Sequence, residues 1–285
     1  MVALLCFSYS DCVHANVSAI DSIKLTSSDY NGVNISCNGA NDGSITLTVN
    51  GGTSPFTFMW STGATTQNVT SLVAGTYTVT VIDATNDTLK GTSVLIEATS
   101  VTVNCVNDSN VTCNGLADGG ATATATGGIA PYTYLWSNGT STGSATNLVA
   151  NTYTVTATDA NGCTSTCDVV ITEPGILTAS CSKNDISCNG LTDGETTVTP
   201  AGGTGPFSYL WSNAQTNSTA TGLSAATYTV TVTDSEGCTA SCDVAITEPL
   251  ILTAACVVDT NVNCNGGADG EATVTAGGGT GPYSY

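Results

Sequence analysis

An internal repeat constrains the fold of this chain more than any other feature of its sequence. Five kinds of landmark residue recur at a spacing of 75 or 76 residues. They are an aspartate (Asp42, Asp118, Asp193, Asp269), a proline (Pro55, Pro131, Pro206, Pro282), a tryptophan (Trp60, Trp136, Trp211), a tyrosine (Tyr77, Tyr153, Tyr228) and a glutamate (Glu97, Glu173, Glu248). Landmarks that advance together identify tandem copies of one structural unit. The chain therefore holds three complete units and part of a fourth.

These copies divide the 285 residues into five segments. We assign them as an N-terminal segment (1–24), repeat 1 (25–98), repeat 2 (99–174), repeat 3 (175–249) and partial repeat 4 (250–285). The N-terminal stretch MVALLCFSYSDCVHA resembles the apolar region and cleavage site of a secretory signal, although it lacks a basic start. The alternative is a strand donated to a neighbouring, incomplete unit.

Each unit has the pattern of short β-strands. In TYTVTATDA, which starts at Thr152, threonines alternate with Tyr153, Val155 and Ala157, and this period of two is typical of a strand. Clusters of Gly, Asn and Asp separate the strands, and no window shows a helical stripe. The sequence predicts an all-β fold of tandem immunoglobulin-like β-sandwich repeats arranged as a rod. We expect Trp136 in the core and Tyr153 in a tyrosine corner.

The charge balance limits the partners of the chain. It has 22 Asp+Glu against three Lys+Arg, a net charge of −19. Such a chain repels phosphate backbones, which argues against nucleic-acid binding, and it has no basic face for an anionic membrane. It also lacks a second long apolar stretch, so we expect no direct membrane insertion.

Catalysis is not expected from this sequence. His14 is the single histidine and lies in the N-terminal segment, so the three complete repeats have no histidine for a nucleophile–base pair. Thirteen cysteines at regular spacings instead indicate an oxidising, extracellular compartment. We predict that the protein is not an enzyme.

The motif CNGxxDG occurs four times, at Cys37, Cys113, Cys188 and Cys264. Its Asn-Gly and Asp-Gly steps favour a tight corner between strands, because they supply residues with positive φ. The alternative is a calcium loop in which Asp118 and a carbonyl are oxygen ligands, but one carboxylate is too few for a good site. The structural corner is therefore the favoured interpretation.

Calcium remains an option at the junctions between repeats. In a rod the chain enters and leaves each unit at opposite ends, which would bring Asp118 and Glu173 of repeat 2 near Asp234 and Glu236 of repeat 3. Clustered carboxylates repel one another unless a cation joins them. The alternative is a set of solvated turns without an ion.

The cysteines fit disulfides better than a zinc site. Repeat 2 carries Cys105, Cys113, Cys163 and Cys167, and repeat 3 carries Cys181, Cys188, Cys238 and Cys242. These spacings match no common zinc-binding pattern, and four cysteines allow three disulfide pairings. Repeat 1 lacks the later pair, so Cys37 is expected to bond to Cys6 or Cys12, or to stay free.

Four motifs together resemble a known family. CNGxxDG, GGTGPFSYLWSN, ATYTVTVTDSEGC and ITEP, as they stand between residues 30 and 285, are similar to the SprB-type repeat of large gliding adhesins of Bacteroidota. The resemblance implies an extracellular location and an adhesive or filamentous role, with no catalytic residue or defined ligand. It also implies the pairs Cys113–Cys163 and Cys188–Cys238, which leave Cys105–Cys167 and Cys181–Cys242.

We therefore predict an extracellular structural filament or adhesin stalk. Its expected partners are further copies of the same unit, by self-association or by continuation into a longer fibre. Two alternatives remain: a surface adhesin that binds carbohydrate or another ligand, and a spacer for a domain beyond residue 285. Surface glycans are the partner expected for the first alternative.

Covalent glycans are a further expectation. The sequence Asn-x-Ser/Thr occurs at eight sites (Asn16, Asn34, Asn68, Asn86, Asn107, Asn110, Asn138, Asn217). Ser22 and Thr88 lie in an Asp-Ser/Thr-aliphatic motif that Bacteroidota modify. Either set would make the chain a glycoprotein.

Overall fold

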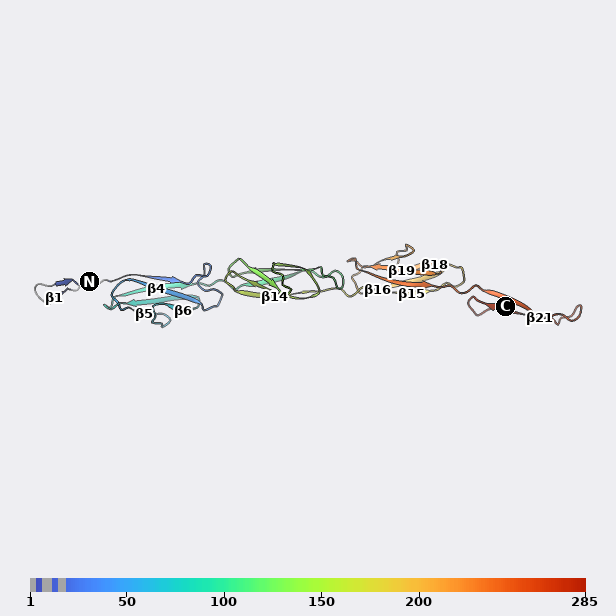
Figure 1. Cartoon of the computed structure of the whole chain (residues 1–285), viewed down its shortest axis with the longest axis horizontal. Helices are drawn as coiled ribbons and strands as arrows, with labels where there is room; N and C mark the ends of the chain where they lie inside the picture. Colours follow the sequence, from blue (N-terminus) through green and yellow to red (C-terminus); the bar gives the residue numbers. More distant parts are fainter. Residues whose placement is uncertain (1–3, 7–11, 15–18) are drawn as a thin grey trace. The chain divides into compact units, whose positions relative to one another are not determined.

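The computed structural model describes residues 4–6, 12–14 and 19–285 (Figure 1). Its internal contacts define two compact units, which we describe separately. Unit 1 is Met1–Asp108, Gly120–Thr146 and Thr152–Val170, and unit 2 is Ser109–Gly119, Asn147–Asn151 and Ile171–Tyr285. The boundary runs through repeat 2, so repeat 2 contributes segments to both units.

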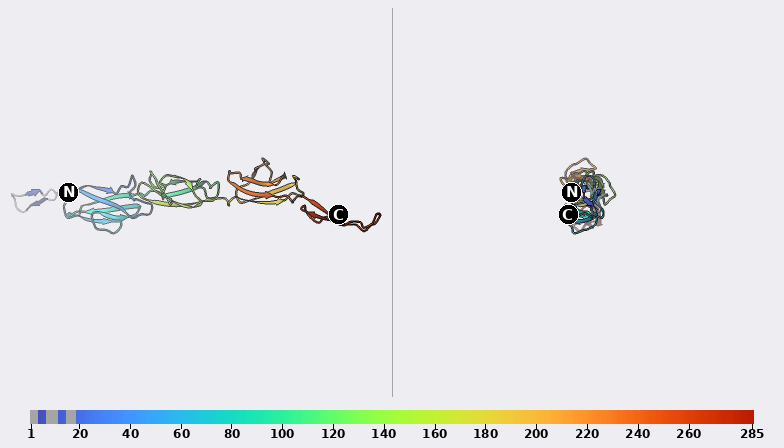
Figure 2. Two further views of the ribbon diagram at one scale, coloured as in Figure 1. Left: turned by 45° about the vertical axis from the view of Figure 1, so that its right-hand side comes forward. Right: turned by 90° about the vertical axis from the view of Figure 1, so that its left-hand side faces the viewer.

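The regular elements of the described residues are β-strands, which Figures 1 and 2 show coloured along the chain. The N-terminal segment has β1 (Leu4–Cys6) and β2 (Cys12–His14). Repeat 1 begins with β3 (Ile20–Ser27), which starts before the predicted boundary at residue 25. It continues with β4 (Gly43–Gly51), β5 (Thr57–Trp60), β6 (Val69–Leu72), β7 (Gly75–Ile82) and β8 (Thr88–Leu95). Within the described part of the chain, no helix is long and apolar enough to cross a membrane.

The later repeats follow the same order of strands. Repeat 2 has β9 (Thr102–Ser109), β10 (Gly119–Thr126), β11 (Thr133–Trp136), β12 (Ser144–Leu148), β13 (Asn151–Thr158) and β14 (Thr164–Ile171). Repeat 3 has β15 (Thr178–Asn184), β16 (Gly194–Ala201), β17 (Ser208–Trp211), β18 (Thr219–Leu223), β19 (Ala226–Thr233) and β20 (Thr239–Ile246). Partial repeat 4 has β21 (Thr253–Thr260) and β22 (Glu271–Gly277), which pair as an antiparallel hairpin.

Each complete repeat contains two three-stranded sheets. In repeat 1 the orders are β3-β4-β6 and β5-β7-β8, and all neighbours are antiparallel. Repeat 3 has the matching orders β15-β16-β18 and β17-β19-β20, and repeat 2 repeats them. These are the A-B-E and C-F-G sheets of an immunoglobulin-like sandwich without its D strand. The predicted fold class, all-β with immunoglobulin-like sandwich repeats, is confirmed.

The strand pattern explains the core of each sandwich. Alternate residues of β7 are buried, including Val79 and Val81, while the threonines between them point outward or lie half-buried. Trp60 is 4% exposed, and its indole Nε1 donates to Thr66 O at 2.8 Å. In repeat 3, Trp211 Nε1 donates to Asn217 O at 2.9 Å. This bond fixes the crossing segment that takes the place of the D strand.

A tyrosine corner closes the sandwich, as the sequence predicts. Tyr77 Oη donates to Val73 O at 2.9 Å, and Tyr228 Oη donates to Ser224 O at 3.2 Å. Each bond spans four residues back along the chain, which is the geometry of this corner in immunoglobulin-like domains. Tyr153, for which the prediction was made, is buried at the same position of repeat 2.

The chain enters and leaves a repeat at opposite ends. In repeat 3, Cys181 bonds to Cys242, and Lys183 Nζ donates to Ala245 O at 2.6 Å. These contacts advance together along both strands, so β15 and β20 run in the same direction. We call the end where the first strand begins the leading end and the other the trailing end.

Much of the N-terminal segment lies outside the described residues. β1 pairs with β2 in register Leu4–His14, and residues 1–3, 7–11 and 15–18 lie outside the described residues. The signal-peptide and donor-strand interpretations of residues 1–24 therefore stay predictions. The side chain of His14 is likewise not described.

Candidate functional site: the disulfide junctions

The CNGxxDG motif forms a tight turn at the trailing end of each repeat. The N–H group three residues after the cysteine donates to the cysteine carbonyl, from Leu116 to Cys113 at 3.0 Å and from Leu191 to Cys188 at 3.1 Å. Gly115 and Gly190, the third residues of these turns, have a φ of 81°. A turn with positive φ at this position requires glycine or asparagine. The predicted corner is thus the observed structure.

The motif's aspartate closes the same loop. Asp118 accepts hydrogen bonds from Thr112 Oγ1 and, at 3.1 Å, from Thr112 N. Asp193 accepts from Ser187 Oγ at 2.5 Å and from Ser187 N at 3.2 Å. In both loops the side-chain hydroxyl bond, helped by the backbone bond, lowers the pKa of the aspartate.

A second motif of the same repeat clamps this turn. Asn114 Nδ2 donates to Pro174 O at 3.0 Å, and Gly115 N donates to Glu173 Oε2 at 2.7 Å. In repeat 3, Gly190 N donates to Glu248 Oε2 at 2.8 Å. The CNG and TEP motifs, about sixty residues apart, recur together because they hold one another. Their joint effect is to fix the cysteine at the trailing end.

A buried aspartate positions the other junction cysteine, at the leading end. Asp234 is 5% exposed and accepts from Thr204 N and Cys238 N, both at 2.9 Å. The bond from Thr204 N, with those from the turn behind it, keeps the pKa of Asp234 below its usual range despite burial. Asp159 holds Cys163 N in the same way, at 2.9 Å. Sequence reasoning did not single out this role, although the pattern Asp-x-x-Gly-Cys was visible in repeats 2 and 3.

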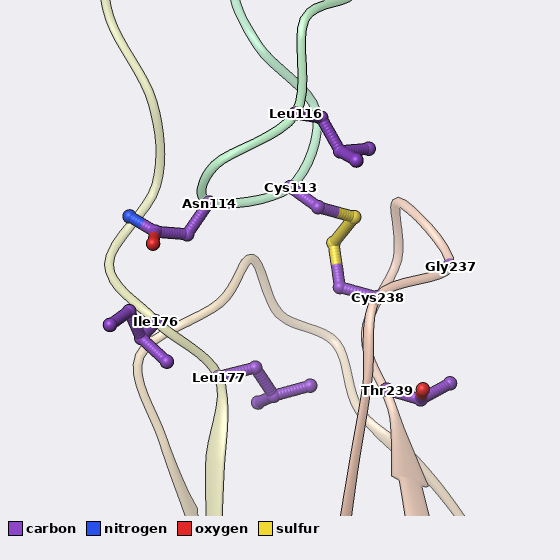
Figure 3. A pocket seen from close by; sticks show the side chains of 8 residues that line it. All are labelled: Cys113, Asn114, Leu116, Ile176, Leu177, Gly237, Cys238 and Thr239. Atoms are coloured by element: carbon purple, nitrogen blue, oxygen red, sulfur yellow. A yellow bond between two sulfur atoms is a disulfide. The ribbon is translucent and has the colours of Figure 1, made fainter.

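The two fixed cysteines bond between consecutive repeats. Cys37 of repeat 1 bonds to Cys163 of repeat 2, and both lie in unit 1. Within unit 2, Cys113 bonds to Cys238 of repeat 3 (Figure 3). The Cα–Cα distance is 5.7 Å in both, within the usual range for a disulfide.

This connectivity corrects three predictions. The pairs Cys113–Cys163 and Cys188–Cys238 are wrong, because Cys163 bonds to Cys37 and Cys113 bonds to Cys238. In repeat 3, Cys188 lies at the trailing end and Cys238 at the leading end. An eight-residue strand spans about 26 Å, and a disulfide tolerates about 7 Å between Cα atoms. The expectation that Cys37 bonds to Cys6 or Cys12, or stays free, is also wrong.

The remaining pairs lie within single repeats. Cys105 bonds to Cys167, and Cys181 bonds to Cys242, with a Cα–Cα distance of 6.1 Å in each. These are the pairs that the sequence predicts, and they join the first strand of a repeat to its last. Three other cysteines, exposed and without a disulfide, are Cys188, Cys256 and Cys264.

A hollow flanks each junction, and the two differ in their surroundings. The hollow beside Cys113–Cys238, of about 370 Å³, is lined by side chains that include Leu116, Ile176 and Leu177 (Figure 3), and the one beside Cys37–Cys163 has about 410 Å³. At the Cys37–Cys163 junction Asn161 Nδ2 donates to Ser36 O at 3.0 Å and to Tyr30 O at 3.1 Å. Glu236 takes the position of Asn161 in repeat 3, and it lacks the side-chain amide N–H₂ with which Asn161 donates. Polar contacts therefore reinforce the first junction and apolar surface flanks the second.

The proposed calcium ligands are committed to other partners. The loops of Asp118 and Asp234 do meet through Cys113–Cys238, but Asp118, Glu173 and Asp234 each accept backbone N–H bonds within their own repeat. Glu236 is exposed. Across residues 4–6, 12–14 and 19–285, no three or more His, Cys, Asp or Glu side chains gather as a metal site. Calcium binding at this junction stays a prediction.

Several candidate glycan acceptors make hydrogen bonds. Asn34 Oδ1, Asn68 Oδ1, Asn110 Oδ1 and Asn138 Oδ1 accept backbone N–H bonds at 3.0–3.1 Å, and Asn107 Nδ2 donates to Val170 O at 2.9 Å. Asn34 is half-buried, and the other described acceptors are exposed (Ser22, Asn68, Asn86, Thr88, Asn107, Asn110, Asn138, Asn217). Asn16 lies outside the described residues. Glycosylation itself stays a prediction.

A family model matches the repeats that carry these junctions. The model of the SprB repeat matches residues 30–65, 100–141, 181–216 and 257–285. The chain belongs to the SprB repeat family. Each matched stretch of this SprB repeat chain contains the CNG turn and the second strand of its repeat (β4, β10, β16 or β22). The predicted family is therefore confirmed.

Comparison with other proteins adds little to this SprB repeat assignment. No curated protein matches the chain. Solved structures that resemble it include the N-terminal four Ig domains of Dscam1 isoform 9.44, with 12% identity and a TM-score of 0.27 over 82% of this chain and 75% of that chain. Dpr2 Ig1-Ig2 in complex with DIP-Theta Ig1-Ig3 has 10% identity and a TM-score of 0.28 over 81% and 98%. The strand order described above carries the fold assignment.

Proposed function

We propose that this chain is a tension-carrying segment of an extracellular adhesin stalk, built from immunoglobulin-like repeats that are covalently joined to one another. The observation that carries the proposal is the pair of disulfides that cross from one repeat to the next, Cys37–Cys163 and Cys113–Cys238. A disulfide within a repeat stabilises that repeat alone. A disulfide between repeats holds the units together even when one of them opens.

The geometry of the junction supports this proposal. Hydrogen-bonded loops place both cysteines, and repeat 2 has one bond forward, through Cys113, and one bond back, through Cys163. Such a pattern extends without limit along a tandem array, because each added repeat offers the same two loops. Disulfides also require an oxidising compartment, which supports a location outside the cell.

Two experiments test this function. Antibodies against residues 19–285 should label intact cells that produce the protein, and negative-stain images of native material should show thin, fairly straight filaments longer than four repeats. Labelling only after permeabilisation would contradict the extracellular location. Compact particles of uniform size would contradict the stalk.

We also propose covalent glycans on the exposed acceptors. The exposed acceptors are six asparagines and two hydroxyl residues (Asn68, Asn86, Asn107, Asn110, Asn138, Asn217, Ser22, Thr88). The intact mass of the native segment should exceed the 28.4 kDa of its sequence and should fall to that value after deglycosylation. A native mass equal to the sequence value would contradict this proposal.

A further inference from the structure

The disulfides shorten the covalent path through the chain. Very few residues separate a cysteine bonded within a repeat from its neighbour bonded between repeats. Four residue steps separate Cys163 from Cys167 and four separate Cys238 from Cys242, while eight separate Cys105 from Cys113. Each disulfide itself closes a long stretch, from 61 residues for Cys181–Cys242 to 126 residues for Cys37–Cys163.

We propose that the disulfides form a covalent ladder that carries tension past the folded repeats. Its rungs are the two bonds within repeats, Cys105–Cys167 and Cys181–Cys242. Two covalent rails connect these rungs. The linker rail is the backbone from Cys167 to Cys181, and the cysteine rail runs from Cys105 to Cys113, across the disulfide to Cys238, and on to Cys242.

The two rails have matching lengths. The linker rail has 14 residue steps, and a residue extends to about 3.5 Å, so this rail becomes taut at about 50 Å. The cysteine rail has eight steps and four steps joined by a disulfide with a Cα–Cα distance of 5.7 Å, and it also becomes taut at about 50 Å. Both rails therefore take tension at the same extension. When either rail is broken, the other still limits the extension of the chain.

The ladder sets how far a repeat can stretch. Without disulfides, the 76 residue steps from Cys105 to Cys181 extend to about 270 Å. With the ladder intact, one rail and one rung limit the same period to about 55 Å, a roughly five-fold reduction. Most of the sandwich, such as residues 114–162, lies outside the rails and bears no tension once they are taut.

Repeat 1 has no rung, which gives an internal control. Its equivalents of Cys181 and Cys242 are Leu25 and Gly91, which occupy the same register positions beside Leu47 and Val79. Among the cysteines whose side chains the structure describes, only the pair Cys37–Cys163 bypasses repeat 1. Breaking one disulfide should therefore allow repeat 1 to extend to its full length. Repeat 3 should extend fully only when two disulfides are broken.

Single-molecule pulling tests the ladder. The chain, held by handles fused at its two ends, is stretched to its full contour length with no reductant. Contour length reports covalent connectivity whether or not a variant folds, so a folding defect does not confuse the result. Three variants are compared with the parent chain: Cys113→Ser with Cys238→Ser, Cys181→Ser with Cys242→Ser, and all four substitutions together.

The ladder predicts redundancy in repeat 3. Each paired variant should keep the parent contour length to within about 20 Å, and the four-fold variant should gain about 200 Å, because the 61 residues from Cys181 to Cys242 become free. In repeat 1, Cys37→Ser with Cys163→Ser should gain about 200 Å at once. A gain of about 200 Å in either paired variant of repeat 3, or no gain in the four-fold variant, would overturn the proposal.

This inference takes its biological meaning from the proposed stalk function, but its test is separate. Surface labelling of cells tests the stalk, and contour length tests the ladder. A chain with the predicted contour lengths that failed to reach the cell surface would contradict the function alone. A surface-labelled chain with independent repeats would contradict the ladder alone.

Discussion

Repeats 1 and 3 stabilise the same position of the same sandwich in different ways. In repeat 3, Cys181 and Cys242 join the first and last strands covalently. In repeat 1, Leu25 faces Gly91, where a Cβ would lie 3.0 Å from Leu25 Cδ1 and 2.6 Å from Ile23 Cδ1. The absent side chain of Gly91 makes room for two large ones. The fold thus accepts either a disulfide or a large-and-small apolar pair between these strands.

The leading ends of the two repeats differ in a related way. Cys238 N donates to Asp234 Oδ1 at 2.9 Å, and Asp87 N donates to Asp83 Oδ1 at the same distance in repeat 1. Cys238 then bonds to another repeat, whereas Asp87 Oδ2 accepts from Ile20 N of its own repeat at 2.8 Å. The loop is the same, and the residue in it decides whether the repeat is joined to a preceding one. Sandwich stability and covalent continuity are therefore separate properties of this fold.

Reduction of the disulfides should give the largest difference in stability between repeats 1 and 3. Repeat 3 takes part in two disulfides and repeat 1 in one, and each is worth roughly 2–5 kcal/mol of unfolding free energy in so small a unit. Hydrogen exchange of peptides around Trp211 should accelerate more on reduction than that of peptides around Trp60. Equal acceleration in both repeats would contradict this account.

Leu25→Ala should destabilise repeat 1 in particular. It leaves a cavity beside Gly91, and the loss of this half-buried side chain should cost about 2 kcal/mol. Hydrogen exchange of repeat 1 should accelerate with and without reductant, while repeat 3 stays unchanged. The neighbouring exposed residue offers a control, since Thr26→Ala should have little effect. If Leu25→Ala and Thr26→Ala had similar effects, the packing of Leu25 would not take the place of the disulfide in repeat 1.

Asp87→Ala should have a smaller and more local effect. It removes the acceptor of the Ile20 N–H group, which should cost about 1 kcal/mol and loosen the start of β3. Amide exchange at residues 20–24 should rise while the core around Trp60 keeps its protection. Asp87→Asn, which retains an acceptor oxygen, serves as the matched control. No change at residues 20–24 would show that the bond does not stabilise the leading end.

Low pH should destabilise the CNG loops, and this is the smallest of the four predicted effects. Hydrogen bonds from Ser187 hold the pKa of Asp193 below its usual value near 4. A lowered pKa in the folded state adds stability that is fully present above the unfolded value and is lost as pH falls through the folded one. The melting temperature should be flat between pH 7 and 5 and fall below about pH 4. Asp193→Asn should reduce this fall, and Glu236→Gln, with the same change of charge, should not.

Much of the fold was readable from the sequence because its determinants are local. Alternating threonines predicted strands, the tryptophan and tyrosine landmarks predicted the core and the corner, and Asn-Gly and Asp-Gly predicted the trailing turn. The rungs were predicted only as the pairs left over by the family resemblance, and the structure shows that Cys105–Cys167 joins the first and last strands of one repeat. These features all depend on contacts inside a single unit.

The junction bonds could not be read in the same way. Spacing alone does not say whether Cys113 bonds to Cys163 of its own repeat or to Cys238 of the next repeat, because these two cysteines stand in equivalent sequence contexts. The strand directions that led us to expect Asp118 of repeat 2 near Asp234 of repeat 3 also favour Cys238, and not Cys163, as the partner of Cys113. The unpaired Cys37 of repeat 1 was the other signal, because only bonds between repeats give it a partner among the equivalent cysteines.

Disulfide mapping without reduction tests the central claim most directly. The chain has only three Lys+Arg, so cleavage at aromatic or acidic residues is needed to separate the cysteines. After thiols are blocked and the native protein is digested, mass spectrometry should find Cys37 linked to Cys163 and Cys113 linked to Cys238. Peptides that link Cys113 to Cys163 would contradict the joining of repeats and, with it, the ladder.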